Sequence, residues 1–409
     1  MEWKEVTLGD LCEISSSKRI FAKEYQTNGI PFYRGKEIIE KQKGNTISNE
    51  LFISRNRYEE IKAKYGVPQQ RELLLTSVGT LGVPYVIKEE EFYFKDGNLT
   101  WFRHFNGLDV EYLYYWFLSP YGKNEINAKA IGSTQKALTI DSLSKFNIKI
   151  PANLEDQRRI ASILSSLDRK IELNNKINAD LEEMAQAIFK NWFVDFEPFK
   201  DRKFVDSELG MIPEGWKVGR LDEIADVVGG STPSKAKPEY YTQKGIAWLT
   251  PKDLSNHPAV YTSRGEIDIT EEGYNSTSTK LMPKGTILFT SRAPIGYISI
   301  AQNDICTNQG FKSLVPKKAG TCFLYCFLKY VTPEIENKST GSTFKEASGS
   351  LMKSLQVIMP EQKVFEDFET IVSPLFARIE SLEKENSRLS LLRDTLLPRL
   401  MSGELEVPE

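Results

Sequence analysis

Cysteine and histidine are scarce in this 409-residue chain, which has four of the first and two of the second. So few cysteines, unevenly placed, indicate free thiols in a reducing compartment. No apolar run approaches the ~18 residues that span a bilayer, and the first ten residues lack the basic-then-apolar layout of a signal peptide. We therefore expect a cytoplasmic protein that has no membrane segment and holds no metal.

Familiar catalytic motifs are missing as well. The chain has neither a Gly-x-x-x-x-Gly-Lys-Ser/Thr phosphate loop nor a Gly-x-Gly-x-x-Gly dinucleotide loop. It also lacks the Asn/Asp-Pro-Pro-aromatic motif with which amino-methyltransferases hold the target amine. His104 and His257 stand in no zinc-like or triad-like setting, and we predict that this chain holds no catalytic site.

The charge balance excludes a protein that attracts nucleic acid through overall charge, because the net charge is −3. The balance is nevertheless patterned along the chain. Residues 1–154 carry +2, residues 155–196 carry −2, residues 197–360 carry +2, residues 361–400 carry −2 and the tail carries −3. Any contact with DNA must therefore come from local basic groups on the two +2 segments.

What the chain does have is two long stretches with a 3.5-residue apolar repeat held for about five heptads. The repeat places one stripe on one side of a helix and requires a helical partner. Each helix would be roughly 57 Å long at about 1.5 Å per residue, so the two most simply bury each other as an intramolecular antiparallel coiled coil. The first stripe is Ile160, Leu164, Leu167, Ile171, Asn174, Asn178, Leu181, Ala185, Ile188 and Trp192; the second is Phe368, Val372, Leu375, Ile379, Leu382, Asn386, Leu389, Arg393, Leu396 and Leu400.

The remaining sequence is one unit written twice. The clearest match is ungapped and runs from Ile131 to Pro151 against Thr340 to Pro360. Trp3-Lys4 also matches Trp216-Lys217, Gly29 to Phe32 matches Gly245 to Trp248, Leu75 to Ser77 matches Phe289 to Ser291, and Gly82 matches Gly296. A period near 210 residues is too long for a solenoid, so we interpret it as the duplication of a whole domain with its helix.

Each globular segment mixes apolar β-branched strands with helical spacing, which indicates an α+β fold with an open sheet. Strands are predicted at Glu72–Val78, Asn147–Ile150, Gly285–Ser291 and Gln356–Met359, and helices at Val110–Leu118 and Thr321–Val331. The predicted boundaries are 1–153 for the first domain, 154–196 for the first spacer helix, 197–213 for a linker, 214–360 for the second domain, 361–402 for the second helix and 403–409 for a tail.

Two matching polar loops are the best candidates for a binding site. Gly132 to Lys136 and Gly341 to Lys345 each offer hydroxyls, backbone amides beside a glycine and one cation, which suit phosphate contact. Gln135 and Phe344 differ between the copies, as expected of two readers of different sequences. The competing interpretation is that these segments are ordinary turns and helix caps.

The chain resembles the specificity (S) subunit of a Type I restriction-modification system over essentially its whole length. The resemblance rests on the domain–helix–domain–helix order, on Pro151 with Glu155-Asp156-Gln157-Arg158, on Pro360-Glu361-Gln362, on Phe193 to Pro198 and on Asp206 to Trp216. It implies two pseudo-symmetric target-recognition domains separated by the coiled coil, each reading one half of a bipartite site on double-stranded DNA. It also implies two methyltransferase (M) subunits that hold S-adenosylmethionine and methylate adenine, and restriction (R) subunits that use ATP and Mg. This chain itself would be non-catalytic and would hold no cofactor.

On this interpretation the helices act as a ruler of at most about 15–17 base pairs at ~3.4 Å each. The residues that we predict to contact DNA are Arg34, Lys36, Ser77, Ser133, Thr134, Gln135, Lys136, Lys252, Ser291, Arg292, Ser342, Thr343, Phe344 and Lys345. Arg292 could contact a guanine with two hydrogen bonds. The helix residues Arg158, Arg159, Arg169 and Glu172 either dock the M subunits or form solvated flanks of the coiled coil.

Two other functions stay open. A stand-alone regulator with two DNA-binding domains would have to bind DNA tightly as the isolated chain, which its near-neutral charge disfavours. A scaffold that binds only proteins would show no DNA readout.

Overall fold

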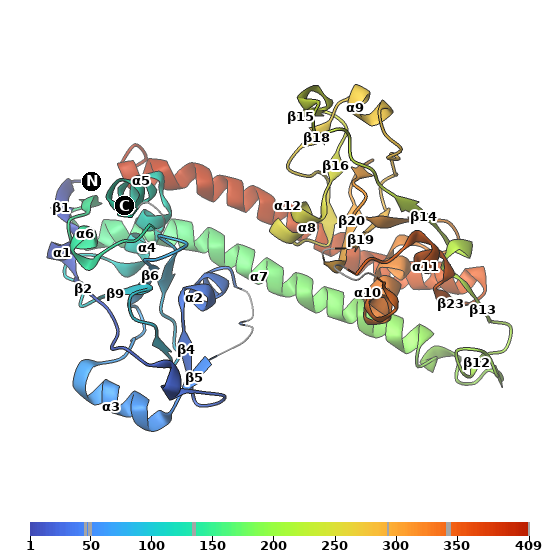
Figure 1. Ribbon diagram of the computed structural model, residues 1–409, viewed down its shortest axis with the longest axis horizontal. Helices are drawn as coiled ribbons and strands as arrows, with labels where there is room; N and C mark the ends of the chain where they lie inside the picture. Colours follow the sequence, from blue (N-terminus) through green and yellow to red (C-terminus); the bar gives the residue numbers. More distant parts are fainter. Residues whose placement is uncertain (45–46, 48–50, 133–135, 293, 341–344, 408–409) are drawn as a thin grey trace. The chain divides into compact units, whose positions relative to one another are not determined.

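The computed structural model describes residues 1–44, 47, 51–132, 136–292, 294–340 and 345–407. They form two compact units, of which unit 1 comprises 1–173 and 386–409 and unit 2 comprises 174–385. Two long helices, α7 (Leu154–Phe193) and α12 (Gln362–Ser402), contribute to both units. Within each unit a stretch of α7 (green) lies beside a stretch of α12 (red) (Figure 1).

Unit 1 contains three small sheets and a set of short helices. The antiparallel pair β1 (Trp3–Thr7) and β10 (Asn147–Pro151) leads directly into α7. One four-stranded sheet has the order β2 (Glu13–Ser15), β9 (Leu99–Arg103), β6 (Leu73–Thr76), β7 (Pro84–Val86), and the other has the order β3 (Tyr25–Gln26), β5 (Leu51–Ile53), β4 (Ile30–Tyr33), β8 (Tyr93–Phe94). The helices are α1 (Leu8–Leu11), α2 (Gly35–Gln42), α3 (Arg55–Tyr65), α4 (Val110–Leu118), α5 (Pro120–Lys129) and α6 (Ile140–Ser144).

Unit 2 repeats this plan with a fifth strand in its main sheet and one additional strand pair. The pair β13 (Lys217–Arg220) and β23 (Gln356–Met359) precedes α12, and the main sheet has the order β14 (Ala225–Gly229), β22 (Lys312–Pro316), β19 (Ile287–Ser291), β20 (Ile295–Ala301), β17 (Tyr261–Thr262). The smaller pairs are β15 (Tyr241–Thr242) with β18 (Asp268–Ile269) and β16 (Trp248–Leu249) with β21 (Cys306–Thr307). The helices are α8 (Pro251–Asn256), α9 (Glu271–Asn275), α10 (Thr321–Lys338) and α11 (Gly349–Ser354), and β11 (Phe204–Val205) pairs with β12 (Ile212–Pro213).

The strand registers of the two units agree, which confirms the predicted duplication and the α+β fold. Lys4 lies opposite Ile150 in unit 1, and its sequence match Lys217 lies opposite Met359 in unit 2. Ile30 likewise lies opposite Ile53, as Ile246 lies opposite Ile269. The six elements predicted from local pattern are all present, and only α10 extends well past its predicted end.

The helix stripe is as predicted over most of its length but shifts by one residue at the end of α7. Ile160, Leu164 and Ala185 are fully buried, whereas Ile188 and Trp192 are only partly buried. Phe189 and Phe193, 2% and 4% exposed, take the inward positions instead. A straight α-helix drifts about 20° per heptad from a strict seven-residue repeat, and here the drifting face meets the core of unit 2.

The paired stretches of the two helices run antiparallel within a unit. In unit 2, Asn174 Nδ2 donates to Glu385 Oε2 over 3.1 Å, and the rings of Phe189 and Phe368 are 6.2 Å apart. In unit 1, Arg393 and Asp168 form an ion pair of 2.7 Å, so the arginine in the predicted stripe has a partner. The helix α12 also continues through Pro374 and Pro398 without a break.

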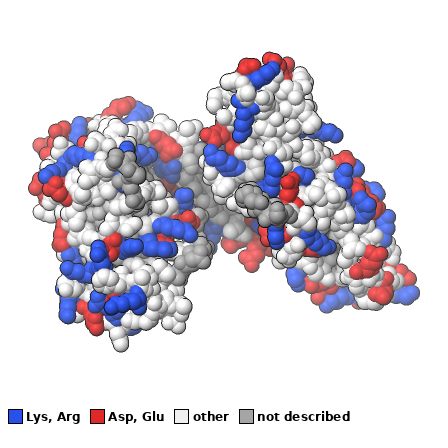
Figure 2. All heavy atoms as spheres, in the orientation of Figure 1, with Lys and Arg blue, Asp and Glu red and all other residues white. Residues whose placement is uncertain are grey.

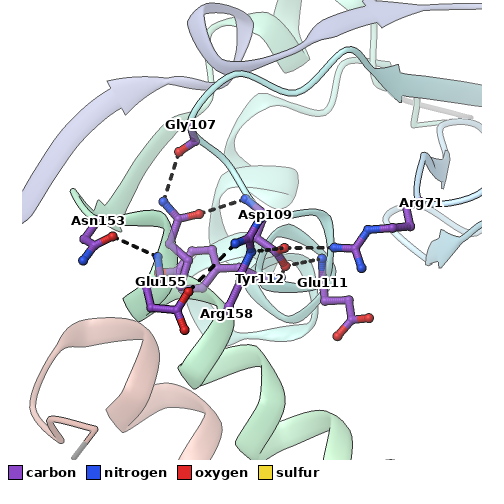
Figure 3. Close-up of polar contacts among 9 residues, drawn as sticks. Arg71, Gly107, Asp109, Glu111, Tyr112, Asn153, Glu155 and Arg158 are labelled. Carbon is purple, nitrogen blue, oxygen red and sulfur yellow. Dashed lines mark hydrogen bonds and ion pairs between the residues drawn. The ribbon is translucent and has the colours of Figure 1, made fainter. Parts of the chain in front are cut away.

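A glutamine near the start of each long helix fastens the preceding domain to it. Gln157 Nε2 donates to the carbonyls of Gly107 and Pro151, and its Oε1 accepts the backbone N–H of Asp109 (Figure 3). Gln362 Nε2 donates to the carbonyl of Lys318. Lys318 lies two residues before the N-cap of α10, and Gly107 lies two residues before the N-cap of α4. The glutamines of the two family-like motifs therefore share a structural role.

The first turns of α4 and α10 are capped by different means. Asp109 caps α4 itself, because its Oδ1 accepts the N–H groups of Glu111 and Tyr112 (Figure 3). At the same place α10 has Gly320, and Glu369 of α12 supplies the carboxylate that accepts N–H groups from Cys322 and Phe323. A Cβ on Gly320 would lie 2.1 Å from Glu369 Cδ, so the glycine makes room for this carboxylate.

Glu383 of α12 makes a similar attachment to the edge strand β17. Its two carboxylate oxygens accept the backbone N–H groups of Val260 and Tyr261 at 2.7 and 3.0 Å. Burial raises the pKa of Glu383 to about 7, although the two N–H groups favour the charged form.

We predict that this carboxyl makes the folded chain less stable as pH rises. Between the ordinary glutamate pKa of 4.5 and the folded-state pKa of about 7, Glu383 keeps a proton in the folded chain that the unfolded chain has lost, so the free energy of unfolding falls as pH rises through that range. Urea titrations give the free energy of unfolding at pH 5 and at pH 8. In Glu383→Gln the fall between these two values should be smaller by about 2 kcal/mol than in the wild type. Glu366→Gln, an exposed change on the same helix, should leave the slope as it is; equal slopes in all three proteins would contradict the prediction.

Candidate nucleic-acid interface

The predicted loop and the predicted strand end of unit 1 lie together in the fold. Ile131 and Ala137 exchange two backbone hydrogen bonds of 2.9 and 2.8 Å, which close the loop that carries Lys136. The backbone N–H of Leu138 then donates to the carbonyl of Ser77, at the end of β6. Two segments that are about 55 residues apart in the sequence thus form one surface feature.

Unit 2 repeats this arrangement with other side chains. The N–H of Glu346 donates to the carbonyl of Thr340, and the N–H of Ala347 donates to that of Ser291, each over 2.9 Å. Arg292 and Glu346 pair as a β-bridge, as Val78 and Ala137 do in unit 1. We call each assembly a strand-end site, made of the described residues 76–83, 130–132 and 136–138 in unit 1 and of 290–292, 294–297, 339–340 and 345–347 in unit 2.

Six of the predicted loop residues, Ser133, Thr134, Gln135, Ser342, Thr343 and Phe344, lie outside the described residues. Lys136 and Lys345 are described, and both are exposed. Lys345 Nζ donates to the carbonyl of Glu336 over 3.3 Å.

The two predicted serines are buried beneath their sites. Ser77, 2% exposed, shares a 2.6 Å hydrogen bond with Thr100, while Ser291, fully buried, donates to the carbonyl of Gly310. Their placement does not support direct contact with a ligand; both hydroxyls are satisfied inside the sheet. The match between the two copies predicted that these serines are equivalent, but it did not predict that their side chains point into the sheet. Each serine lies at the end of a strand, where the alternation of inward and outward side chains is no longer regular.

Arg292 belongs to a small ionic network that the sequence did not indicate. Its guanidinium is 3.8 Å from the carboxylate of Glu346, which Lys312 approaches at 3.3 Å. Lys312 lies next to Ser291, at the position that Thr100 has next to Ser77. The long Arg292–Glu346 pair is half-exposed and therefore weak, so the guanidinium can exchange it for a base edge or a phosphate.

Three further predicted cations lie on the first turns of α2 and α8. Arg34 forms a 2.5 Å ion pair with Glu37, Lys36 is exposed, and Lys252 is exposed within 3.6 Å of Glu266. α2 begins against the site of unit 1, because a Cβ on Gly35 would be 3.9 Å from Thr76 Cγ2. α8 begins beside Gly310, where a Cβ would be 2.7 Å from Pro251 Cγ, and the carbonyl of Gly310 accepts the N–H of Ser291 in the site of unit 2. The fold thus brings the predicted cations of each unit toward its own strand-end site.

A hollow of about 650 Å³ adjoins the strand-end site of unit 1. Its apolar wall includes Leu118 and Ile126, and its polar lining includes Gln42, Lys123, Asn127 and Lys136. Gly82, at φ 76°, opens the turn beside it, because a Cβ there would lie 2.5 Å from Ile126 Cδ1. Ammonium and amide donors around an apolar wall suit a phosphate beside a base edge. Sequence reasoning missed Gln42, Lys123 and Asn127, which come from other helices.

The predicted partner-binding residues lie on α7 in unit 1 and have unequal surroundings. Arg158 lies 3.7 Å from Asp109 and 3.9 Å from Glu155, so it supports the capped start of α4 (Figure 3). Arg159 pairs with Asp156 at 3.8 Å, and Glu172 pairs with Lys88 at 3.8 Å. For Arg169, which is exposed, no ion pair is found among the described residues. Arg169 and Glu172 are therefore the better candidates for a docking surface.

Cations, amides and hydroxyls are among the polar groups that line the two strand-end sites and the hollow. Across the described ranges, no cluster of His, Cys, Asp or Glu could ligate a metal ion. No helix in that part of the chain combines the length and the apolar character that a bilayer span requires. Basic and acidic side chains are interspersed on the face drawn in Figure 2, so local groups must supply any attraction for phosphate.

The duplicated domain gives this chain two strand-end sites on the same backbone plan. A family model for the Type I restriction modification DNA specificity domain matches residues 1–183 and 213–390. The chain belongs to that family.

Relatives and a solved structure agree with this assignment. The specificity subunit of type I restriction enzyme MjaIX from Methanocaldococcus jannaschii is 41% identical over 192 residues, 46% of this chain and 44% of that protein, so this match spans less than half of the relative. The HindI specificity subunit from Haemophilus influenzae is 27% identical over 339 residues, 68% of this chain and 73% of that protein. The crystal structure of a Type I restriction-modification S subunit from M. genitalium has the same fold, with a TM-score of 0.59 at 19% identity over 98% of this chain and 96% of that one.

Proposed function

We propose that this chain is the DNA sequence-specificity subunit of a Type I restriction-modification complex. The observation that carries the proposal is one site built twice on one backbone with different side chains. Val78, Thr100 and Ala137 of unit 1 stand where unit 2 has Arg292, Lys312 and Glu346. Two domains that recognise different half-sites require the same backbone for phosphate contacts and different side chains for base contacts.

Each strand-end site faces one half of a bipartite target on double-stranded DNA. Lys36, Lys136, Lys252 and Lys345 are exposed cations suited to phosphates, which fix register but carry no sequence information. Arg292 is suited to a guanine, where a bidentate contact is worth about 1–3 kcal/mol of discrimination.

The chemistry belongs to the partners. On this proposal two M subunits bring S-adenosylmethionine and methylate adenine, and R subunits bring ATP-dependent cleavage with Mg. This chain contributes sequence choice and assembly in the cytoplasm and holds no cofactor of its own.

The long helices set the distance between the half-sites. At 40 residues, α7 is about 60 Å long at about 1.5 Å per residue. That length matches at most roughly 18 base pairs at ~3.4 Å each. The distance between the half-sites then depends on the helices, while the identity of each half depends on its own domain.

Gel shifts with the purified chain, with and without a cognate M subunit, test the main proposal. We expect weak binding by the chain alone, because its net charge is −3, and a specific bipartite footprint once M is added. Tight specific binding without M would instead indicate a stand-alone regulator, and no DNA binding in either case would indicate a protein scaffold.

A paired insertion should lengthen the spacer without changing either half-site. Seven residues after Leu173 in α7, with seven after Glu385 in α12, lie at the boundary between the two units, keep the apolar stripes in phase and add about 10 Å. Mapping of methylated adenines should then show the same half-sites about three base pairs further apart. Seven residues inserted after the exposed Asp201 serve as the control, and an unchanged spacer in the paired variant would remove the ruler.

Charge reversal on α7 tests the docking surface. Arg169→Glu with Glu172→Lys should abolish co-purification with the M subunit and leave the melting temperature unchanged, because both side chains are exposed. Lys145→Glu, an exposed change directly after α6, is the matched control. Retained co-purification would assign Arg169 and Glu172 to solvent.

A further inference from the structure

A hollow of about 570 Å³ in unit 2 is lined by polar and charged residues and by one leucine. Three cations, Arg220, Lys338 and Lys353, contribute to it, as do the hydroxyls of Thr340, Ser348 and Ser354. Leu351 is the apolar member among the described lining residues. A concave surface of ammonium, guanidinium and hydroxyl groups offers donors from several directions, as the oxygens of a phosphodiester require.

The uncompensated charge in this hollow is positive. Arg220 pairs with Asp222 at 2.7 Å and Lys338 pairs with Glu334 at 2.6 Å, but these are surface pairs that are easily exchanged. No ion pair of Lys353 is found within the described ranges. The carboxylate that lines the hollow, Glu346, already has a cationic neighbour in Lys312 at 3.3 Å.

The equivalent surface of unit 1 lacks two of these cations, although Lys145, paired with Asp141, stands there where unit 2 has Ser354. Thr7 lies opposite Asn147 in unit 1, and Arg220 lies opposite Gln356 in unit 2, so Arg220 is the structural equivalent of Thr7. Thr7 is neutral and donates to Asp10 over 2.6 Å.

Lys353, on α11, also has a counterpart in unit 1. The N–H of Leu8 donates to the carbonyl of Phe146, and the N–H of its match Leu221 donates to the carbonyl of Leu355. Phe146 and Leu355 are therefore equivalent, and so are Ser144 and Lys353, two residues before them. Because the same backbone is built without these two cations in unit 1, the fold does not require them.

The geometry points to a clamp in unit 2 that binds the sugar–phosphate backbone of DNA beside the half-site. This inference rests on the proposed function. The choice of DNA follows from continuity: Thr340 and Glu346 line this hollow and also close the loop of the strand-end site, where Glu346 pairs with Arg292. A duplex that meets Arg292 therefore passes beside the hollow.

The clamp makes the two domains unequal partners. Phosphate contacts supply affinity that does not depend on sequence and that salt weakens. Domain 2 then has a salt-dependent backbone contact at a place where domain 1 lacks the two equivalent cations.

The test exchanges the clamp for the residues of unit 1. Arg220→Thr with Lys353→Ser is made in the full chain and assembled with the M subunit, and the Kd for a duplex carrying the mapped target is measured between 50 and 200 mM salt. Affinity at the lowest salt should fall on the order of 10- to 100-fold, and the slope of log K against log salt should become shallower by about 1–2. The methylated target sequence should stay the same.

Lys145→Ser is the matched control in unit 1, where Lys145 pairs with Asp141 at 2.8 Å, and it should change neither quantity. An unchanged slope and affinity in a variant that melts like the wild type would overturn the clamp. Loss of M co-purification with an unchanged slope would also overturn it and would mark the hollow as a surface for an acidic protein. Failure of the wild-type complex to bind a bipartite target would instead count against the proposed function, so the two failures are distinguishable.

Discussion

Everything in this molecule depends on hiding the apolar stripes of two helices that are about 60 Å long. A helix of that length gains little from its own hydrogen bonds in water and needs a packed face. Within unit 2 the face is covered by the partner helix and by the domain together, since Phe189, Phe368 and Ile379 share one core with Ile287 and Leu314. Burying each such side chain contributes about 1.5–3 kcal/mol. The helix stretch and the domain core are therefore one folding element within the unit.

Polar side chains of the helices then fix the domains on that apolar surface. Gln157, Gln362, Glu369 and Glu383 each bond backbone groups at the start of a helix or at the edge of a sheet. Backbone groups in such places lack partners within their own element, so leaving them unpaired would cost more than one ordinary hydrogen bond contributes. Hydrophobic packing brings each helix stretch and its domain together, and these bonds orient them.

The duplication shows which positions the fold needs and which it leaves free. The registers of β1 with β10 and of β13 with β23 agree residue by residue, and Gly82 and Gly296 both have positive φ beside a helix. Around the strand-end sites the two units differ. Unit 1 has a hydroxyl and apolar side chains at positions where unit 2 has charged side chains. Substitution has been tolerated on the exposed rim, where packing is not at stake, and that rim is where recognition must differ.

The sequence by itself determined the duplication, the long helices, the α+β class and the positions of most strands near the sites. Each follows from spacing or from a match between two stretches of one chain, and both are local properties. Only the tertiary structure decided that Ser77 and Ser291 face inward, that Phe189 replaces Ile188 in the core, and that Lys312 and Lys123 join the sites. These depend on which segments distant in the sequence come to lie side by side. The packing of a whole unit sets that choice, and no short pattern encodes it.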